Sequence, residues 1–198
     1  MTAHPLRCRC GTLRGCVRPG PLGLRALCYC SDCQAYAHHL CKAREVLDDQ
    51  GGTEVVITLQ DRLAFTEGLH QLACLSLTEA GLLRWFAACC DTPLCNTARN
   101  PRMAYVGVMR GAVDHPPATP VDAFGPLRMR VQTAGAKAPV RGTPLATLAG
   151  GARIAAALAA SRLRGRWRQS PLFREDGEPL AQPQVLSPAE LQRAKAAA

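Results

Sequence analysis

The stretch Cys28-Tyr29-Cys30-Ser31-Asp32-Cys33 places three sulfur atoms within six residues. In an extended strand, residues two apart point to the same face with their Cα atoms about 6.6 Å apart. Two sulfurs on a tetrahedral zinc ion lie about 3.7 Å from each other, so modest bending of the strand brings both thiolates onto one ion. A turn of the Cys30-x-x-Cys33 type then presents a third sulfur. Because soft thiolates select zinc over hard cations, the stretch predicts a zinc site.

Two further cysteine groups flank this stretch. They are Cys8-Arg9-Cys10-Gly11 upstream, and Cys89-Cys90 with nearby Cys95 downstream; all 11 cysteines lie between Cys8 and Cys95. Arginines interrupt every apolar run near the N-terminus, so no secretory signal is expected. The chain is expected to be cytoplasmic, where cysteines do not serve as a disulfide framework.

Two other interpretations of the cysteines stay open at this point. They could be unrelated packing residues in strands. Alternatively, Cys30 and Cys33 could form a thioredoxin-like dithiol, which belongs between a strand and a helix in a βαβ unit. The sequence predicts too few helices for such a unit, which favours the zinc interpretation.

The composition favours a mainly β domain with an aliphatic core. Hydrophobic residues make up 47% of the 198 residues, but aromatic residues only 5%. Short runs that alternate or are rich in β-branched residues, separated by Gly and Asp, predict strands. These runs cover residues 12–17, 23–27, 53–59, 63–66, 72–77 and 104–109. A short helix is predicted over residues 32–40, after a turn at Ser31.

The second half of the chain differs in charge and composition. Residues 101–198 carry 14 Lys and Arg against 6 Asp and Glu, whereas residues 1–100 carry 10 against 9. Residues 113–126 are rich in proline and lack periodicity, which predicts a domain edge. We therefore expect a zinc-binding domain over residues 1–112 and a basic Pro/Ala/Arg-rich extension over residues 113–198 that packs on the domain or trails from it.

The extension is expected to contain helices and one strand. A strand is predicted over residues 127–132, a loop through Pro144, a helix over about 152–164 and a final helix that begins at Ser187-Pro188. The stretch 145–160 contains Arg153 and two glycines, and much of the rest is alanine. Such a stretch is a poor membrane anchor, so no transmembrane helix is expected.

Three motifs together resemble one known family. They are Cys8-Arg9-Cys10-Gly11, Cys28-Tyr29-Cys30-Ser31-Asp32-Cys33-Gln34 and Trp85-Phe86-Ala87-Ala88-Cys89-Cys90-Asp91-Thr92-Pro93-Leu94. Through them, residues 7 to about 112 resemble the glutathione-dependent formaldehyde-activating enzyme family, which includes centromere protein V. The family pattern runs Cys-x-Cys-Gly, Cys-x-Cys-Ser-x-Cys and Phe-Cys-x-x-Cys-Gly-Thr-Pro-Leu. The resemblance implies the family's β-tent fold, two zinc ions and glutathione binding.

By the same analogy, the cysteines divide into two zinc sites. Cys8, Cys10 and a downstream pair would hold a structural zinc, while Cys28, Cys30 and Cys33 would hold a functional zinc with an open position. The third motif departs from the pattern, because Ala87 stands in place of the first cysteine and Asp91 in place of the glycine. Cys90 aligns with the retained cysteine. The predicted fourth ligand is Cys89, with Cys95 as the alternative, and a metal shared by Cys89 and Cys90 requires a turn there.

The resemblance implies a carbon-sulfur lyase-like activity at Cys28, Cys30 and Cys33. Three protein thiolates leave the fourth tetrahedral position of zinc to an incoming thiol, which binds deprotonated. Glutathione or a similar small thiol held there could attack an aldehyde carbon to give an S-hydroxymethyl adduct, or the reverse cleavage could occur. The alternative function is a non-catalytic, zinc-stabilised interaction module. The sequence leaves turnover, the acceptor aldehyde and the oligomeric state open.

Several other polar residues near the motifs are expected to play lesser parts. A fourth thiolate would give the functional site a charge of −2, which requires nearby donors or cations. Four basic residues lie near the motifs in sequence, namely Arg25, Lys42, Arg44 and Arg84. His38 and His39 are expected on a helix surface, and Cys16, Cys41 and Cys74 are expected to be buried or half-buried.

The basic extension suggests a second kind of partner. Arg162, Arg164, Arg166 and Arg168 surround Trp167, an arrangement that could contact phosphates and stack on bases. Arginine-rich composition and cations at a helix terminus explain the same residues more simply. Nucleic acid is therefore not the expected partner.

Overall fold

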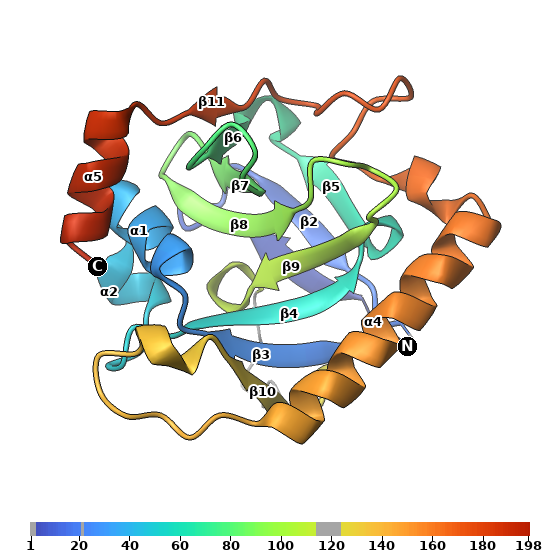
Figure 1. The fold of residues 1–198 in the computed structure, drawn as a ribbon. Coiled ribbons are helices and arrows are strands. Elements are labelled where there is room, and N and C mark those ends of the chain that lie inside the picture. Colours follow the sequence, from blue (N-terminus) through green and yellow to red (C-terminus); the bar gives the residue numbers. More distant parts are fainter. Residues whose placement is uncertain (1–2, 21, 114–123) are drawn as a thin grey trace.

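The computed structural model describes residues 3–20, 22–113 and 124–198, and its fold is mainly β, as predicted (Figure 1). The strands form an eight-stranded sheet in the order β10-β3-β4-β9-β8-β7-β6-β11 and a three-stranded sheet in the order β1-β2-β5. Most of the predicted domain edge, residues 114–123, lies outside the described residues.

The six inner strands of the larger sheet pair antiparallel and come from residues 24–109. They are β3 (Leu24–Cys28), β4 (Thr53–Leu59), β6 (Leu72–Ser76), β7 (Leu83–Ala87), β8 (Thr92–Thr97) and β9 (Tyr105–Met109). The predicted strands at 23–27, 53–59, 72–77 and 104–109 are confirmed. The β-branched residues of β4 fit the middle of a sheet that is buried on both sides.

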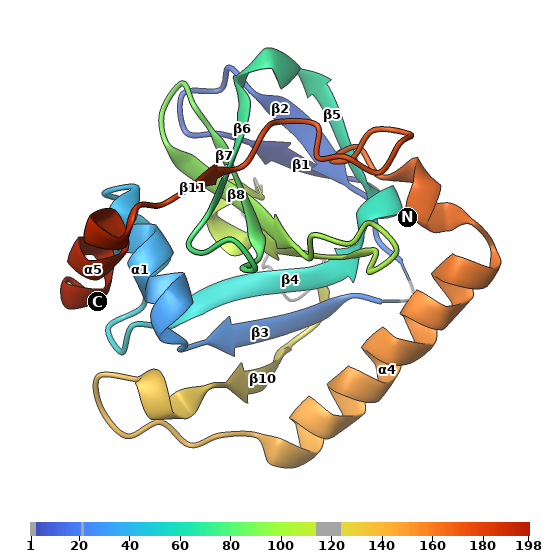
Figure 2. The same ribbon diagram turned by 45° about the horizontal axis from the view of Figure 1, so that its top comes forward.

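The smaller sheet contains β1 (His4–Arg7), β2 (Arg14–Val17) and β5 (Leu63–Glu67), all antiparallel. In Figure 2 it lies in the upper part of the view, on the opposite side of β4 and β3 from β10. Aliphatic side chains from both sheets meet in one core, among them Leu6, Val17, Val56 and Leu83. Trp85 is fully buried in that core and donates from Nε1 to Thr97 Oγ1 at 3.0 Å. This burial fixes β7, and with it the third cysteine motif.

Both edges of the larger sheet come from the C-terminal part. Strand β10 (Leu127–Val131), predicted from sequence, pairs parallel with β3, and β11 (Gln184–Val185) pairs parallel with β6. An exposed sheet edge offers unpaired backbone groups to other chains, and a covering strand removes that exposure. The C-terminal part therefore completes the sheet that carries the second and third cysteine motifs.

The helices lie outside the sheets. They are α1 (Ser31–His39), α2 (Ala43–Val46), α4 (Pro144–Leu163) and α5 (Pro188–Ala196). Single 3-10 turns cover Gln60–Arg62, Leu69–Gln71, Arg110–Ala112, Thr133–Gly135 and Arg166–Gln169. The predicted helices at 32–40 and after Ser187 are confirmed, the latter with a full capping box between Ser187 and Glu190.

Helix α4 begins about two turns earlier than predicted. Pro144 was expected in a loop, but it occupies the first turn, where the missing N–H of proline has no cost. The two glycines do not break the helix, because Gly150 allows close packing on β10. A Cβ atom added at Gly150 would lie 2.3 Å from Met129 Sδ. Gly150 is thus a contact residue between α4 and the sheet.

By length and apolar composition alone, α4 would also qualify as a membrane-spanning helix. Of the qualifying window, 11% is buried within the protein, and Leu145, Leu148 and Leu163 are exposed. Core helices of other proteins and signal sequences have a similar length and apolar composition, so these two properties do not assign α4 to a membrane. The expectation that no helix spans a membrane stays a prediction.

The C-terminal part supports the loop that carries the second cysteine motif. Helix α5 lies against α1, and Lys195 Nζ lies 3.4 Å from Asp32 Oδ1 (Figure 1). The buried Gln34 side chain donates from Nε2 to Tyr29 O at 2.9 Å and to Gly135 O at 2.8 Å. A Cβ atom at Gly135 would lie 2.2 Å from Tyr29 O, so only glycine fits there. Residues 28–34 are thus held in place by contacts with Gly135 and α5, both of which belong to residues 124–198.

Candidate metal centres

The first candidate centre is a group of four cysteines from distant parts of the chain. The Sγ atoms of Cys8, Cys10, Cys89 and Cys90 all lie within 4.8 Å of one another. Cys8 Sγ lies 3.5 Å from Cys10 Sγ and 3.7 Å from Cys89 Sγ, and Cys10 Sγ lies 3.3 Å from Cys89 Sγ. These distances are near the roughly 3.7 Å between sulfurs on a tetrahedral zinc ion. The donor set therefore fits a closed four-thiolate metal site.

Two turns bring these four thiols together. After β1, Gly11 N donates to Cys8 O at 3.0 Å, and Gly11 has a φ of 77°. Residues 88–91 form the turn between β7 and β8, in which Asp91 has a φ of 52°. A positive φ favours glycine, the residue that the resembled family has at this place. Because Cys89 and Cys90 lie in a turn, the adjacent side chains join one group. The turn that a shared metal requires is therefore present.

Hydroxyl and amide groups surround the four thiols. Leu13 N donates to Cys8 Sγ at 3.3 Å, and Thr12 Oγ1 lies 3.2 Å from Cys10 Sγ. The hydrogen bond with Thr12 lowers the pKa of the Cys10 thiol from 9.0 to about 6. At neutral pH this favours the thiolate, which is the form that binds metal.

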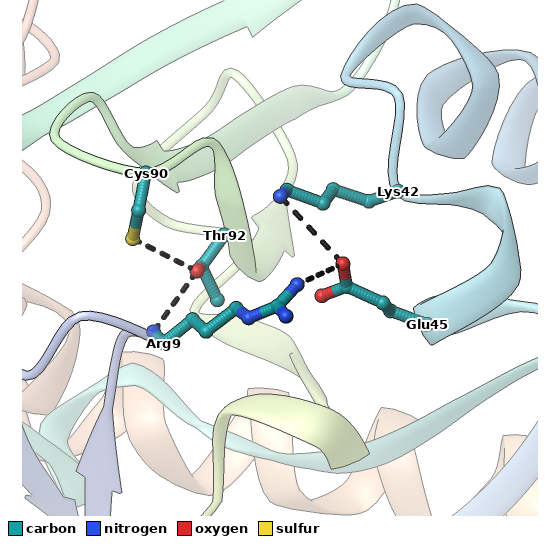
Figure 3. A network of polar contacts seen from close by, with 5 residues as sticks. All are labelled: Arg9, Lys42, Glu45, Cys90 and Thr92. Carbon is teal, nitrogen blue, oxygen red and sulfur yellow. Dashed lines mark hydrogen bonds and ion pairs between the residues drawn. The ribbon is translucent and has the colours of Figure 1, made fainter.

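A polar network joins this group to α2 (Figure 3). Thr92 Oγ1 lies 3.1 Å from Cys90 Sγ and accepts from Arg9 N at 3.0 Å. The Arg9 side chain pairs with Glu45, which also lies 3.6 Å from Lys42 Nζ. The carboxylate of Glu45 is thus shared between Arg9 and Lys42.

The second candidate centre contains Cys28, Cys30 and Cys33. Cys28 ends β3, Cys30 is the N-cap of α1 and Cys33 lies in the first turn of that helix. Their Sγ atoms lie within 4.8 Å of one another, and Cys33 N donates to Cys30 Sγ at 3.4 Å. Among the described residues, no histidine, aspartate or glutamate completes the group. The donor set therefore fits a metal with three protein thiolates.

The three thiols differ in their affinity for protons. Hydrogen bonding with Cys28 lowers the pKa of Cys30 to about 2, and hydrogen bonding with Cys30 raises the pKa of Cys28. Cys30 also lies at the N-terminus of α1, where the helix dipole favours negative charge. Negative charge within the group is thus favoured at Cys30.

Of the four basic residues named from sequence, Arg84 contacts this centre. Its Nη1 lies 3.9 Å from Cys33 Sγ, and its side chain is buried on β7. Arg25 instead pairs with Glu54 at 2.7 Å, Lys42 pairs with Glu45, and Arg44 is exposed. Distance along the sequence could not show which of the four basic residues contacts the thiols, because Arg84 and Cys33 are 51 residues apart in the chain.

The remaining cysteines and histidines lie away from both centres. Cys95, the alternative fourth ligand, is buried in β8 outside the four-cysteine group, and Cys74 is buried as expected. Cys16 is half-buried, but Cys41 is exposed rather than buried, because α1 ends there in a turn with a φ of 56°. His38 and His39 line a cavity of about 230 Å³ together with residues of α5. They therefore face α5 and do not join the thiols.

A cavity of about 300 Å³ lies beside α2, lined by Leu27, Glu54 and Met109 of the sheet and by Thr92 and Pro93 of β8. None of the seven cysteines of the two centres lines it. The cavity thus adjoins the four-cysteine group only through Thr92, whose Oγ1 lies 3.1 Å from Cys90 Sγ.

Comparison with known proteins gives a family and a distant structural likeness. No curated protein matches the chain. A crystal structure of a Rhodobacter sphaeroides protein is 20% identical over 62% of this chain and 96% of that chain, with a TM-score of 0.40. The comparisons do not name the family that the three motifs resemble. The model of the family of unknown function DUF6151 matches residues 1–184, and the chain therefore belongs to that family.

Proposed function

We propose that this protein binds two zinc ions and uses one of them to hold glutathione or a similar small thiol, as a carbon-sulfur lyase-like protein of the cytoplasm. The observation that carries the proposal is the unequal size of the two thiol groups, four in one and three in the other. Four thiolates fill a tetrahedral zinc, whereas three leave a position for another ligand. The resemblance of the three motifs to the formaldehyde-activating enzymes supports the same division.

In this proposal the four-cysteine group has a structural role. Cys8 and Cys10 follow β1 of the smaller sheet, and Cys89 and Cys90 lie between β7 and β8 of the larger one. A metal held by all four would join the two sheets across 81 residues of sequence. Zinc in such closed sites contributes directly to folding.

We also propose that the chain has the β-tent fold of the resembled family. In this proposal, both centres lie in the domain of residues 1–112, and residues 113–198 are an extension that supports it.

The three-cysteine group has the functional role. Cys28, Cys30 and Cys33 would hold zinc, and when bound the metal lowers the pKa of an incoming thiol and holds the thiolate for reaction. A thiol held by the group would add to an aldehyde carbonyl: the carbon-sulfur bond would form, the carbonyl electron pair would move to oxygen and the oxygen would take up a proton. The product would be a hemithioacetal, which is the S-hydroxymethyl adduct when the aldehyde is formaldehyde. The reverse reaction breaks the same carbon-sulfur bond. The half-buried Cys28 and Cys30 leave the group accessible on one side.

Metal analysis and zinc-edge X-ray absorption test this function. Protein purified without added metal should contain two zinc ions per chain, and added glutathione should raise the mean number of sulfur ligands per zinc. Less than one zinc per chain would refute the proposal. A sulfur number that glutathione does not change would favour the non-catalytic zinc module instead.

A further inference from the structure

Arg84 presents an electrostatic problem that the protein residues alone do not solve. Its side chain is 3% exposed on β7, and its Nε is buried without a hydrogen-bond partner. Within the described part of the chain, no carboxylate forms an ion pair with it. Its contacts are Cys33 Sγ, 3.9 Å from Nη1, and the ring of Tyr36, whose centroid lies 5.1 Å from Cζ. A buried guanidinium stays charged, so it requires a negative partner.

The three-cysteine group supplies that partner. The Tyr36 ring offers only a quadrupole, whereas Cys33, the thiol that Arg84 contacts, becomes a thiolate when it binds a metal. Three thiolates with one divalent metal carry −1, which equals the charge of Arg84 with opposite sign. The four-cysteine group differs, because the two cations of the polar network beside it, Arg9 and Lys42, pair with Glu45. The buried cation therefore belongs specifically with the three-cysteine group.

Resting on the proposed function, we propose that Arg84 is a positioning residue that donates to the Cys33 thiolate and balances the charge of the three-cysteine metal site. With Arg84 present, the site and its cation together are neutral before a fourth ligand arrives. An anionic ligand such as a thiolate then brings the total to −1 instead of −2. Arg84 thus lowers the electrostatic cost of a monoanionic fourth ligand at this site, and small thiols are a class of ligand that fits.

Zinc retention in Arg84→Met and Arg84→Lys tests the assignment. Methionine keeps much of the length without the charge, and lysine keeps the charge. In titrations with a competing chelator, the zinc of the three-cysteine site should bind about 10 to 100 times more weakly in Arg84→Met, as is usual when a ligand loses its supporting contact. Arg84→Lys should recover most of that affinity. The rise in sulfur ligands on adding glutathione should also be lost in Arg84→Met and regained in Arg84→Lys.

The zinc of the four-cysteine site is an internal control for folding. Arg84→Met should retain this zinc with unchanged affinity; Arg84→Gln provides a second neutral variant if the methionine variant does not fold. Arg25→Met is the matched control, since Arg25 is also buried but pairs with Glu54. It should leave the affinity of both zinc sites unchanged.

Two results would refute the role assigned to Arg84 and leave the proposed function standing. One is a wild-type protein with two zinc ions and an Arg84→Met variant that retains both with wild-type affinity. The other is an equal loss of affinity in Arg25→Met, which would make the effect a general cost of removing a buried arginine. A wild-type protein that holds no zinc at the three cysteines would instead refute the proposed function, and the role of Arg84 with it.

Discussion

Replacement of Cys90 by serine is expected to destabilise the whole domain by removing one ligand of the four-cysteine site. Structural zinc sites contribute about 10–16 kcal/mol of apparent binding free energy to folding. Shared equally among four ligands, this gives about 2.5–4 kcal/mol for Cys90. A folded chain of 198 residues loses about 2–4 °C of Tm per kcal/mol, so Tm should fall by about 5–16 °C. The side chain is only half-buried, so lost packing adds little.

Thermal unfolding followed by circular dichroism, together with metal analysis, measures this effect. Cys16→Ser is the matched control, because Cys16 is half-buried in β2 and lies outside both thiol groups. It should change stability by about 1 kcal/mol or less. Adding a zinc chelator should lower the Tm of the wild type toward that of Cys90→Ser. If both serine variants unfold at the same temperature with the same zinc content, the reasoning about the four-cysteine site is wrong.

Three further outcomes are expected. Cys30→Ser should release one zinc while the protein stays folded, as metal analysis and circular dichroism would show; complete unfolding would contradict the separate roles of the two centres. Asp91→Gly should leave stability unchanged or raise it, whereas Asp91→Val should lower it by about 1–2 kcal/mol in denaturant unfolding, because a β-branched residue disfavours the left-handed φ of 52°. Ser187→Ala should cost about 1 kcal/mol through loss of the N-cap. The hydrogen bond from Ser187 lowers the pKa of Glu190 below 4.5, so its stabilisation should be present above pH 4.5 and disappear as the pH falls through the lowered pKa. A stability difference between wild type and Ser187→Ala that persists unchanged at low pH would contradict the pH dependence.

Most strands were predictable because period-two patterning and β-branched residues act locally. The run at 53–59 became β4 with the same bounds, and the cap at Ser187 marked the start of α5. The start of α4 was predicted about two turns too late, because Pro144 was placed in a loop and no local pattern shows that Gly150 packs against Met129. The strands at both sheet edges pair with partners more than 100 residues away, and no local pattern specifies such a partner.

The candidate centres divide in the same way. Cys28, Cys30 and Cys33 lie within six consecutive residues, from the end of β3 to the first turn of α1, so their spacing alone predicted that the three thiols would meet. Sequence also proposed Cys89 beside Cys90, on condition that a turn formed there. Only the tertiary structure brings that turn to Cys8, and only it places Arg84 against Cys33. The physical reason is that short-range spacing limits where neighbouring atoms can go, whereas the approach of distant segments depends on the packing of the entire core.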